Sequence, residues 1–418
     1  MRPHPRFPVL ADALPLPRRG ALAVLLAAAL ATACGGGGSD AGSAGTATVS
    51  AATVFTQGTV TGFGSVIVNG VRFDDTGVAA VDDDGRAGTL QLGMSVEVDS
   101  GAIDASRRSA RAHALRFGAQ LKGPVASVAA DGLSLVALGQ VVDITDTTVF
   151  DASLSGGLAA LLAGEVVEVH GTTNATTGHI VATRIEREAS ASTYQLRGAV
   201  ANLDTTLKTF TLGGATIDYS GIDAARVPAT LADGRLLRVT LATTPLDAAT
   251  NRWQATSLGI RGAASQADRD TSEVRGSITA FSSAARFSID GLAVDASAAS
   301  FPDGSAGLLL GARVEVHGTV SNGVLVATQV ALASQTEVAD EDRGHERDRH
   351  FELHGAITAV DTVNQTFQLR GVTVSYAGTV AYVNGSATGL LVGAKVEVKG
   401  GAGSTRTLVQ ASRIKFES

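Results

Sequence analysis

The sequence predicts an all-β protein made of five tandem, small, five-stranded β-barrels, each with a short helix or turn, behind a segment that directs export. Three observations support this. The 418 residues include 49 Gly but only 4% aromatic and 17% charged residues, a mix that suits short strands and turns better than long helices. Four sequence markers recur five times in one order. Around these markers apolar and polar residues alternate with the period of a strand.

The first element is a secretory signal over residues 1–33. Arg18 and Arg19 precede an apolar run from Ala21 to Ala33 that ends in small residues. A positive region, a short apolar core and a small-residue cleavage site define such a signal. The alternative, a transmembrane anchor, is disfavoured because the run is shorter than the about 20 residues that a span needs. No run of that length follows residue 34.

The second element is the only cysteine, Cys34, which directly follows the small-residue triplet Ala-Thr-Ala. This arrangement resembles the lipobox of bacterial lipoproteins, although Ala31 stands where that family usually has Leu. A single cysteine has no partner for an internal disulfide, and lipidation would give it a use. The resemblance implies a membrane anchor through lipid on Cys34. Because Gly35 rather than Asp comes next, it also implies the outer membrane, facing the periplasm or the cell surface.

Cys34 and the Gly/Ser-rich tether that follows it together occupy residues 34–56. Such a composition gives a flexible linker. We expect it to hold the folded part of the chain away from the membrane.

The remaining chain repeats one unit. The first marker is a Gly inside a strand, at Gly58, Gly123, Gly198, Gly276 and Gly355. The second is a Gly between two alternating runs, at Gly70, Gly139, Gly214, Gly291 and Gly371. The third is the Gly of G-x-x-V-E-V, at Gly93, Gly164, Gly234, Gly311 and Gly393. The fourth is an Ala in a closing strand, at Ala112, Ala182, Ala255, Ala327 and Ala411.

Each unit is expected to contain two strands joined by a tight hairpin, a third strand, a short helix or turn, and two further strands. Asn69-Gly70, Gly213-Gly214 and Asp290-Gly291 fit the two-residue hairpin turn, which favours residues that tolerate positive φ. In V-E-V the two Val would point inward and the Glu outward. The third-marker Gly would form the turn into this strand.

That strand order resembles the OB-fold, a five-stranded Greek-key barrel. A small open sandwich is the alternative, and a stacked solenoid is disfavoured because its repeats are usually shorter. The units are expected at residues 57–118, 119–190, 193–262, 272–334 and 350–418. The third is the most diverged, with Arg238 in place of the usual Glu.

Charge disfavours nucleic acid as a partner. The formal net charge is −7, and removal of residues 1–33 makes it more negative because that segment carries more Arg than Asp. Nucleic-acid binding normally requires a basic surface. The single Trp and four Tyr also disfavour stacking platforms for single strands or sugars.

A charged linker at 335–349 separates the last two units and supplies metal-site candidates, His345 and His350, with His354 just beyond. Histidines and carboxylates can bind divalent metals. However, arginines interleave with the acidic residues, which is typical of a solvated linker. We therefore expect no metal and no cofactor.

Two other acidic patterns are weaker candidates. The stretch VDDDGRAG at 81–88 lacks the alternate ligands and terminal Glu of a calcium loop, so we expect a polar loop. The Glu of V-E-V recurs, but an outward strand position takes charge for solubility alone. His170 and His317 follow V-E-V where other units have Asp99 and Lys399, a variation typical of a surface position.

Together, the lipobox, the tether and the tandem G-x-x-V-E-V units resemble bacterial lipoproteins built from repeats of an uncharacterised domain. The resemblance implies an OB-like barrel and an envelope location, and it transfers no catalytic or binding residue. We expect a non-catalytic envelope lipoprotein that presents surface for protein or glycan contacts. The alternative is an OB-type binder of an oligosaccharide or a small ligand. An enzyme is disfavoured because no acid, base and nucleophile constellation is recognisable.

Overall fold

The computed structural model describes residues 54–104, 106–174, 177–260, 269–289, 292–310, 312–321, 323–332, 351–404 and 408–417. Within these ranges the secondary structure is strand, with four short 3₁₀ helices and no α-helix. Cys34, the signal segment, His345, His350, Gly291 and Gly311 lie outside the described residues.

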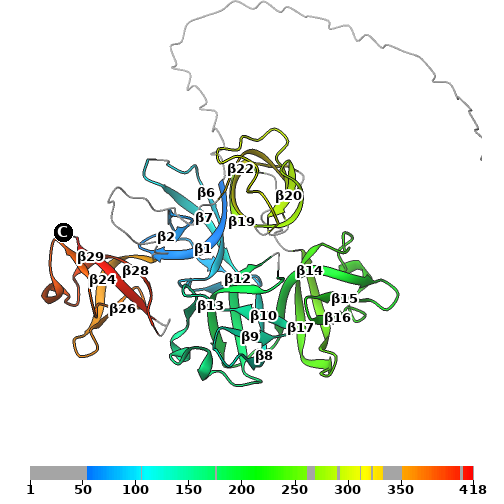
Figure 1. The fold of residues 1–418 in the computed structure, drawn as a ribbon, viewed down its shortest axis with the longest axis horizontal. Coiled ribbons are helices and arrows are strands. Elements are labelled where there is room, and N and C mark those ends of the chain that lie inside the picture. The colour runs from blue at the N-terminus through cyan, green and yellow to red at the C-terminus, as the bar shows by residue number, and fades with distance from the viewer. Residues whose placement is uncertain are drawn as a thin grey trace, which may run out of the picture. The chain divides into compact units, whose positions relative to one another are not determined.

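The strands form five barrels, which we number along the chain (Figure 1). Barrel 1 consists of β1 (Val54–Phe63), β2 (Val66–Val68), β3 (Val71–Asp74), β4 (Ala80–Val81), β5 (Ala87–Gly88), β6 (Ser95–Ser100) and β7 (Ser109–Phe117). Barrel 2 consists of β8 (Leu121–Val128), β9 (Ser134–Ala137), β10 (Gln140–Asp143), β11 (Val149–Phe150), β12 (Val166–Thr173) and β13 (Ile180–Glu188), with η1 (Ala152–Leu154) and η2 (Gly157–Ala160).

Barrel 3 consists of β14 (Tyr194–Asp204), β15 (Thr209–Leu212), β16 (Ala215–Asp218), β17 (Leu236–Asp247) and β18 (Arg252–Ile260), with η3 (Ala224–Arg226). Barrel 4 consists of β19 (Arg269–Ser283), β20 (Arg286–Ile289), β21 (Leu292–Asp295), β22 (Arg313–Ser321) and β23 (Val324–Leu332). Barrel 5 consists of β24 (Phe351–Asp361), β25 (Thr366–Leu369), β26 (Val372–Ser375), β27 (Ala381–Val383), β28 (Lys395–Ala402) and β29 (Val409–Phe416), with η4 (Ala387–Gly389).

Each barrel closes in the same way, and barrel 3 is the simplest example. Its first three strands form an antiparallel meander, β14–β15–β16. The third strand then pairs in parallel with the fifth, β16 with β18, while β17 pairs antiparallel with both β18 and β14. The strand order is thus a closed ring, which leaves no open sheet edge within the barrel. The ring is visible for β19, β20 and β22 of barrel 4 in Figure 1. The predicted all-β array of small OB-like barrels is confirmed.

Within the described residues, the second-marker glycines Gly70, Gly139, Gly214 and Gly371 occupy the hairpin tips between the second and third strands. Asn69 and Gly70 have φ of 53° and 72°, and Arg370 and Gly371 have 54° and 77°, the left-handed pair that a type I′ turn needs. In barrel 3 only Gly213, at 51°, has positive φ. The predicted tight hairpin is therefore present, with a different turn in barrel 3.

The third-marker glycines turn the chain into the fourth strand. Gly93, Gly164, Gly234 and Gly393 have φ between 81° and 90°. Each donates its backbone N–H to a carbonyl of the first strand, as Gly164 does to Val125 at 2.8 Å. The turn therefore closes the barrel where the first and fourth strands meet, and a left-handed φ favours glycine there.

A β-bulge lies in the fifth strand of every barrel, opposite the residues that follow V-E-V or its counterpart in barrel 3. The register between the fourth and fifth strands shifts there, for example between His170 and Gly171. A Cβ added to Gly171 would lie 2.3 Å from the carbonyl oxygen of Val181. The same contact occurs at Gly318 and Gly400, at 2.2 Å in each case. Gly171, Gly318 and Gly400 therefore stand where two backbones approach closely at a bulge, a contact that no local sequence signal indicates.

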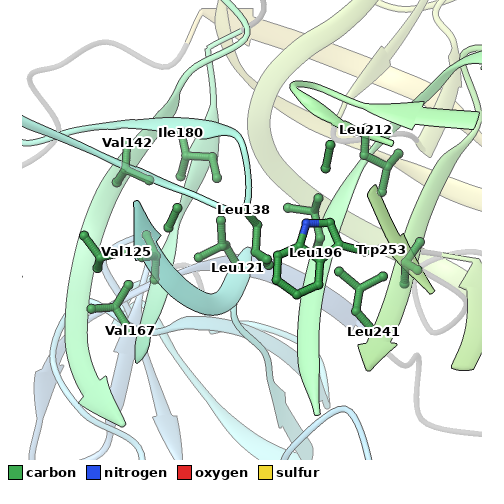
Figure 2. Packing of buried hydrophobic residues seen from close by; sticks show 14 of the residues in the cluster. Leu121, Val125, Leu138, Val142, Val167, Ile180, Leu196, Leu212, Leu241 and Trp253 are labelled. Carbon is green, nitrogen blue, oxygen red and sulfur yellow. The ribbon is translucent and has the colours of Figure 1, made fainter. Parts of the chain in front are cut away.

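The cores of barrels 2 and 3 merge where β8 and β14 pair antiparallel. Leu121 of β8 and Leu196 of β14 are register partners, and both belong to one buried cluster that also includes Trp253 (Figure 2). The hairpin tips of these barrels also touch, because Gly214 donates its N–H to the Gly139 carbonyl at 3.2 Å.

Barrel 1 contacts each of the other four barrels. Strand β1 pairs in parallel with β19 of barrel 4 over Val54–Gln57 and with β24 of barrel 5 at Gly62 and Phe63. Its contacts with barrels 2 and 3 are side-chain contacts described below. Strand β1 begins at Val54 and β19 at Arg269, each three residues before the unit start expected from the sequence. The extension of β1 and the last residue of the β19 extension, Thr271, take part in the parallel pairing between the two barrels.

Candidate interaction faces

The outer face of each barrel is formed by outward side chains of its first, fourth and fifth strands. V-E-V places its Val inward as predicted, since Val167, Val169, Val396 and Val398 have no exposed surface. The Glu between them points out of the barrel but is largely covered, with 13–14% of the side chain exposed at Glu168, Glu315 and Glu397. The outer faces are therefore contact surfaces rather than freely solvated ones.

In barrel 2 the outer face is covered by barrel 1. Glu168 pairs with Lys122 at 3.1 Å, and its Oε1 lies 3.4 Å from His170 Nε2. Burial would raise the pKa of Glu168, but the neighbouring His170 and Lys122 lower it to about 2. The Nδ1 atom of His170 accepts the backbone N–H of Ser95 from barrel 1 at 3.4 Å. The predicted surface position of His170 is wrong, because barrel 1 buries this ring completely.

In barrel 5 the corresponding face carries Glu352, His354 and Glu397. His354 Nε2 lies 2.6 Å from Glu352 Oε1, and its Nδ1 lies 3.3 Å from Glu417 Oε1. Arg72 of barrel 1 forms an ion pair with Glu352. The Glu352 hydrogen bond raises the pKa of His354 against the opposing effect of burial. Burial would raise the pKa of Glu352, but His354 and Arg72 lower it.

The backbone of barrel 1 approaches this cluster closely. A Cβ added to Gly64, whose φ is +136°, would lie 2.5 Å from the Cβ of His354. A Cβ added to Gly62 would lie 2.1 Å from the Glu352 carbonyl oxygen. These two glycines thus allow barrel 1 to pack directly on β24.

In barrel 4 the face carries Glu273, Glu315 and His317. His317 Nε2 lies 2.7 Å from Glu315 Oε1. Glu273 of β19 stands opposite His317 of β22 in the antiparallel register and is buried. The His317 side chain is 40% exposed, in contrast to His170, its equivalent in barrel 2.

Both the barrel 4 and the barrel 5 clusters bring one potential metal-ligand atom from each of three residues within 4.8 Å of one another. A histidine with two carboxylates is a ligand set that suits zinc or a similar divalent metal. In barrel 5, however, Arg72, Lys399 and Lys415 lie against the same carboxylates. We therefore interpret the barrel 5 cluster as an ion-pair network between barrels. Of the predicted metal candidates, His354 belongs to this network.

The acidic loop at 81–88 binds barrel 3. Asp82 caps the loop by accepting the backbone N–H groups of Asp84 and Arg86. Asp83 forms an ion pair with Arg197, and Asp84 lies 3.4 Å from Arg238. Arg238 is the residue that replaces the V-E-V glutamate in barrel 3. The expected polar loop is present, but it bridges two barrels because the outer face of barrel 3 is basic where the others are acidic.

Comparison with known proteins identifies the repeated unit. Residues 122–186, 275–331 and 354–415 match a family described as a domain of unknown function, DUF5666. These segments lie in barrels 2, 4 and 5. No curated protein matches the chain. A solved chain described as drosophila Unr CSD456 is 14% identical, with 55% of this chain and 98% of that chain covered and a TM-score of 0.13.

The fold defines this protein as a tandem array of small OB-like β-barrels. Three of its barrels contain segments similar to DUF5666, so the array holds three matched copies of that uncharacterised domain. Barrels 1 and 3 have the same strand order as the matched copies. Within the described residues we find no helix long and apolar enough to cross a bilayer.

Proposed function

We propose that this chain is a non-catalytic lipoprotein of the bacterial cell envelope that presents an array of β-barrels as interaction surface. The observation that carries the proposal is the joining of charged side chains across barrel boundaries. Arg72 of barrel 1 pairs with Glu352 of barrel 5, and Arg197 of barrel 3 pairs with Asp83 of barrel 1. These charged side chains therefore serve as structural contacts between barrels. Such pairs fix the register of packed surfaces. The lipobox-like segment at Cys34 and the tether after it support the envelope location.

The anchor is tested by replacement of Cys34 with Ser. The unmodified chain should fractionate with membranes and incorporate labelled fatty acid, whereas Cys34→Ser should be released and unlabelled. Ser39→Ala, in the same tether, is the matched control and should behave as the unmodified chain. A Cys34→Ser protein that stays membrane-bound and lipid-labelled would disprove the anchor. Density-gradient separation of inner and outer membranes tests the outer-membrane expectation that comes from Gly35.

A binder of an oligosaccharide or a small ligand is the second candidate. It is favoured by the barrel 4 cluster of Glu273, Glu315 and His317, because His317 is partly open to solvent. Cross-linking in intact cells, followed by mass spectrometry of the adducts, separates the candidates. Protein adducts on barrels 4 and 5 support the interaction array, and a glycan adduct at His317 supports the binder.

A further inference from the structure

The loop that precedes the fourth strand exposes apolar side chains in barrels 2, 4 and 5. We call it the fourth-strand loop; it begins with a Leu buried in its own barrel, at Leu161, Leu308 and Leu390. The next residues point outward and are exposed, at Leu162, Leu309, Leu310, Leu391 and Val392. In barrel 5 the pair is 64% and 67% exposed. The barrel core does not use these side chains, and exposed apolar patches of this kind mark interaction sites.

The fourth-strand loop of barrel 1 shows what such a loop can bind. Leu92, the equivalent of Val392, is 2% exposed and belongs to one buried cluster with Val149 of barrel 2 and with core residues of barrel 5. Thr183 Oγ1 donates to the Gly93 carbonyl at 2.6 Å, and Arg184 Nη1 donates to the Leu92 carbonyl at 3.2 Å. Ser95 then donates its N–H to His170, as described above. Barrel 2 thus binds the fourth-strand loop of barrel 1.

The outer face of barrel 4 repeats the acceptor positions of barrel 2. Glu315, His317 and Thr328 occupy the places of Glu168, His170 and Thr183. Thr328 is exposed and donates its hydroxyl to the His317 carbonyl of its own bulge at 3.1 Å. In barrel 2 the equivalent hydroxyl donates to barrel 1 instead. Val326 beside it on β23 is 43% exposed, which adds an apolar contact for an incoming loop.

Charge complementarity favours the loop of barrel 5 as the occupant. Lys395 stands at the position of Ser95 and is exposed. A loop seated as in barrel 1 would bring this ammonium group to the carboxylates of Glu315 and Glu273. An ammonium that meets partly buried carboxylates favours the correct partner and the correct register.

We propose that this chain binds a second copy of itself, with the fourth-strand loop of barrel 5 seated on the outer face of barrel 4 in the neighbouring copy. The proposal rests on the proposed interaction-array function and names its partner. Loop and face are different surfaces, so the contact is head-to-tail and extends beyond a dimer unless a ring closes. The two segments involved are Leu391–Lys395 and the β22–β23 surface around Glu315, His317, Val326 and Thr328.

Engineered cysteines test the contact, because Cys34 is the only native cysteine. In a Cys34→Ser chain, Val392→Cys and Thr328→Cys proteins are purified separately, mixed and oxidised. We expect a disulfide-linked heterodimer. A mixture of Val392→Cys with Leu207→Cys, which is 66% exposed on barrel 3, is the control. Yields no higher than those of this control would overturn the proposal.

Sedimentation of the same Cys34→Ser chain provides an independent measurement. Species heavier than the monomer should increase in proportion as the protein concentration rises. Val392→Glu or Lys395→Glu should weaken this association at least tenfold. Leu162→Glu should not, because the barrel 2 loop has Val166 at the position of Lys395. All three sites are exposed, so unchanged melting temperatures are expected and checked.

Two further outcomes would show that the loop of barrel 5 does not bind a second copy of the chain. If the chain stays monomeric at all concentrations, the self-association proposal is wrong. The proposed envelope function would still stand, because the fractionation of Cys34→Ser tests it separately. If Val392→Glu instead reduces binding to phospholipid vesicles while the chain stays monomeric, the loop is a membrane contact and the self-association proposal is wrong.

Discussion

At the scale of single residues, glycines in this chain meet two separate requirements, a left-handed φ and a close backbone contact. Gly371 has a left-handed φ of +77°, and a Cβ there would meet nothing within 4 Å. Gly214 lacks a left-handed φ, but a Cβ there would lie 2.4 Å from the Gly139 carbonyl oxygen. Gly93 has both constraints, a φ of +85° and Thr183 O at 2.5 Å. The sequence shows each of the three positions only as a repeated glycine, and the backbone φ and the contact geometry distinguish them.

Gly371→Ala and Gly214→Ala therefore test strain and contact separately. Gly371→Ala should lower the free energy of unfolding by roughly 1–2 kcal/mol through left-handed strain in barrel 5 alone. Gly214→Ala should cost about 1–3 kcal/mol by forcing barrels 2 and 3 apart. Chemical denaturation measures both losses, and hydrogen exchange at β8 and β14 locates the second. Equal exchange at these strands in both variants would contradict the contact.

The carboxylate of Glu168 should make barrel 2 sensitive to acid. Its folded pKa of about 2 lies below the usual 4.5, so its contribution is complete above pH 4.5 and is lost as pH falls toward 2. The contribution is on the order of 3 kcal/mol, given 1.4 kcal/mol per pKa unit. The Glu168→Gln variant should have a lower free energy of unfolding at neutral pH. Its free energy of unfolding should also fall less steeply than that of the unmodified chain as the pH is lowered from 4.5 toward 2. Glu165→Gln, on the same barrel, is the comparison, and parallel acid limbs for Glu168→Gln and the unmodified chain would contradict the assignment.

At the scale of elements, the fourth-strand loop turns at a glycine of similar φ in barrels 1 and 5, +85° and +90°, but has two environments. In barrel 1 it lies against barrel 2, and in barrels 4 and 5 its apolar residues are exposed. The sequence predicted the turn, because a Gly before an alternating strand is a local signal. It could not predict the docking, because Leu92 and Val392 are equivalent in sequence and differ only in the barrel that lies opposite.

Gly93→Ala and Gly393→Ala form a matched pair for this docking. Both substitutions place Ala at a left-handed φ and should cost roughly 1–2 kcal/mol. Only Gly93→Ala also pushes a methyl group onto the Thr183 carbonyl, so it should cost more and should expose His170. Unfolding free energies and the NMR signals of His170 measure the difference. Identical losses in the two variants would show that barrel 1 does not pack on barrel 2 in this way.

At the scale of the whole molecule, the described barrels of Ser50–Ser418 belong to one compact unit rather than to separate beads. The repeat markers predicted the barrel type because alternation, hairpin glycines and the V-E-V turn are local. The interfaces escaped prediction because they depend on pairs such as Asp83 with Arg197 and on the parallel pairing of β1 with β19. The same limitation made His170 look like a surface residue, since nothing near it in sequence signals barrel 1.

These interfaces predict that the barrels unfold together. Calorimetry should show fewer transitions than barrels, with a van't Hoff enthalpy larger than that of one isolated barrel. Asp83→Ala leaves Arg197, whose side chain is only 11% exposed, without its partner and should separate a barrel 3 transition from the rest. Asp131→Ala, on an exposed loop of barrel 2, is the control. Five independent transitions in the unmodified chain would refute the shared unit.

The position of β1 also has a consequence for how the chain is made. A ribosome completes barrel 1 first, but Val54–Gln57 receives its parallel neighbour only when Thr271–Val274 has been synthesised, and Gly62 must wait for Glu352. Until then the early part of β1 presents an unpaired backbone edge, which is a template for wrong pairing. Contacts so distant in sequence also close slowly. Barrel 1 is therefore synthesised first but completes its pairing last. A chain interrupted before barrel 4 would keep an unpaired edge on β1 that could pair with other chains.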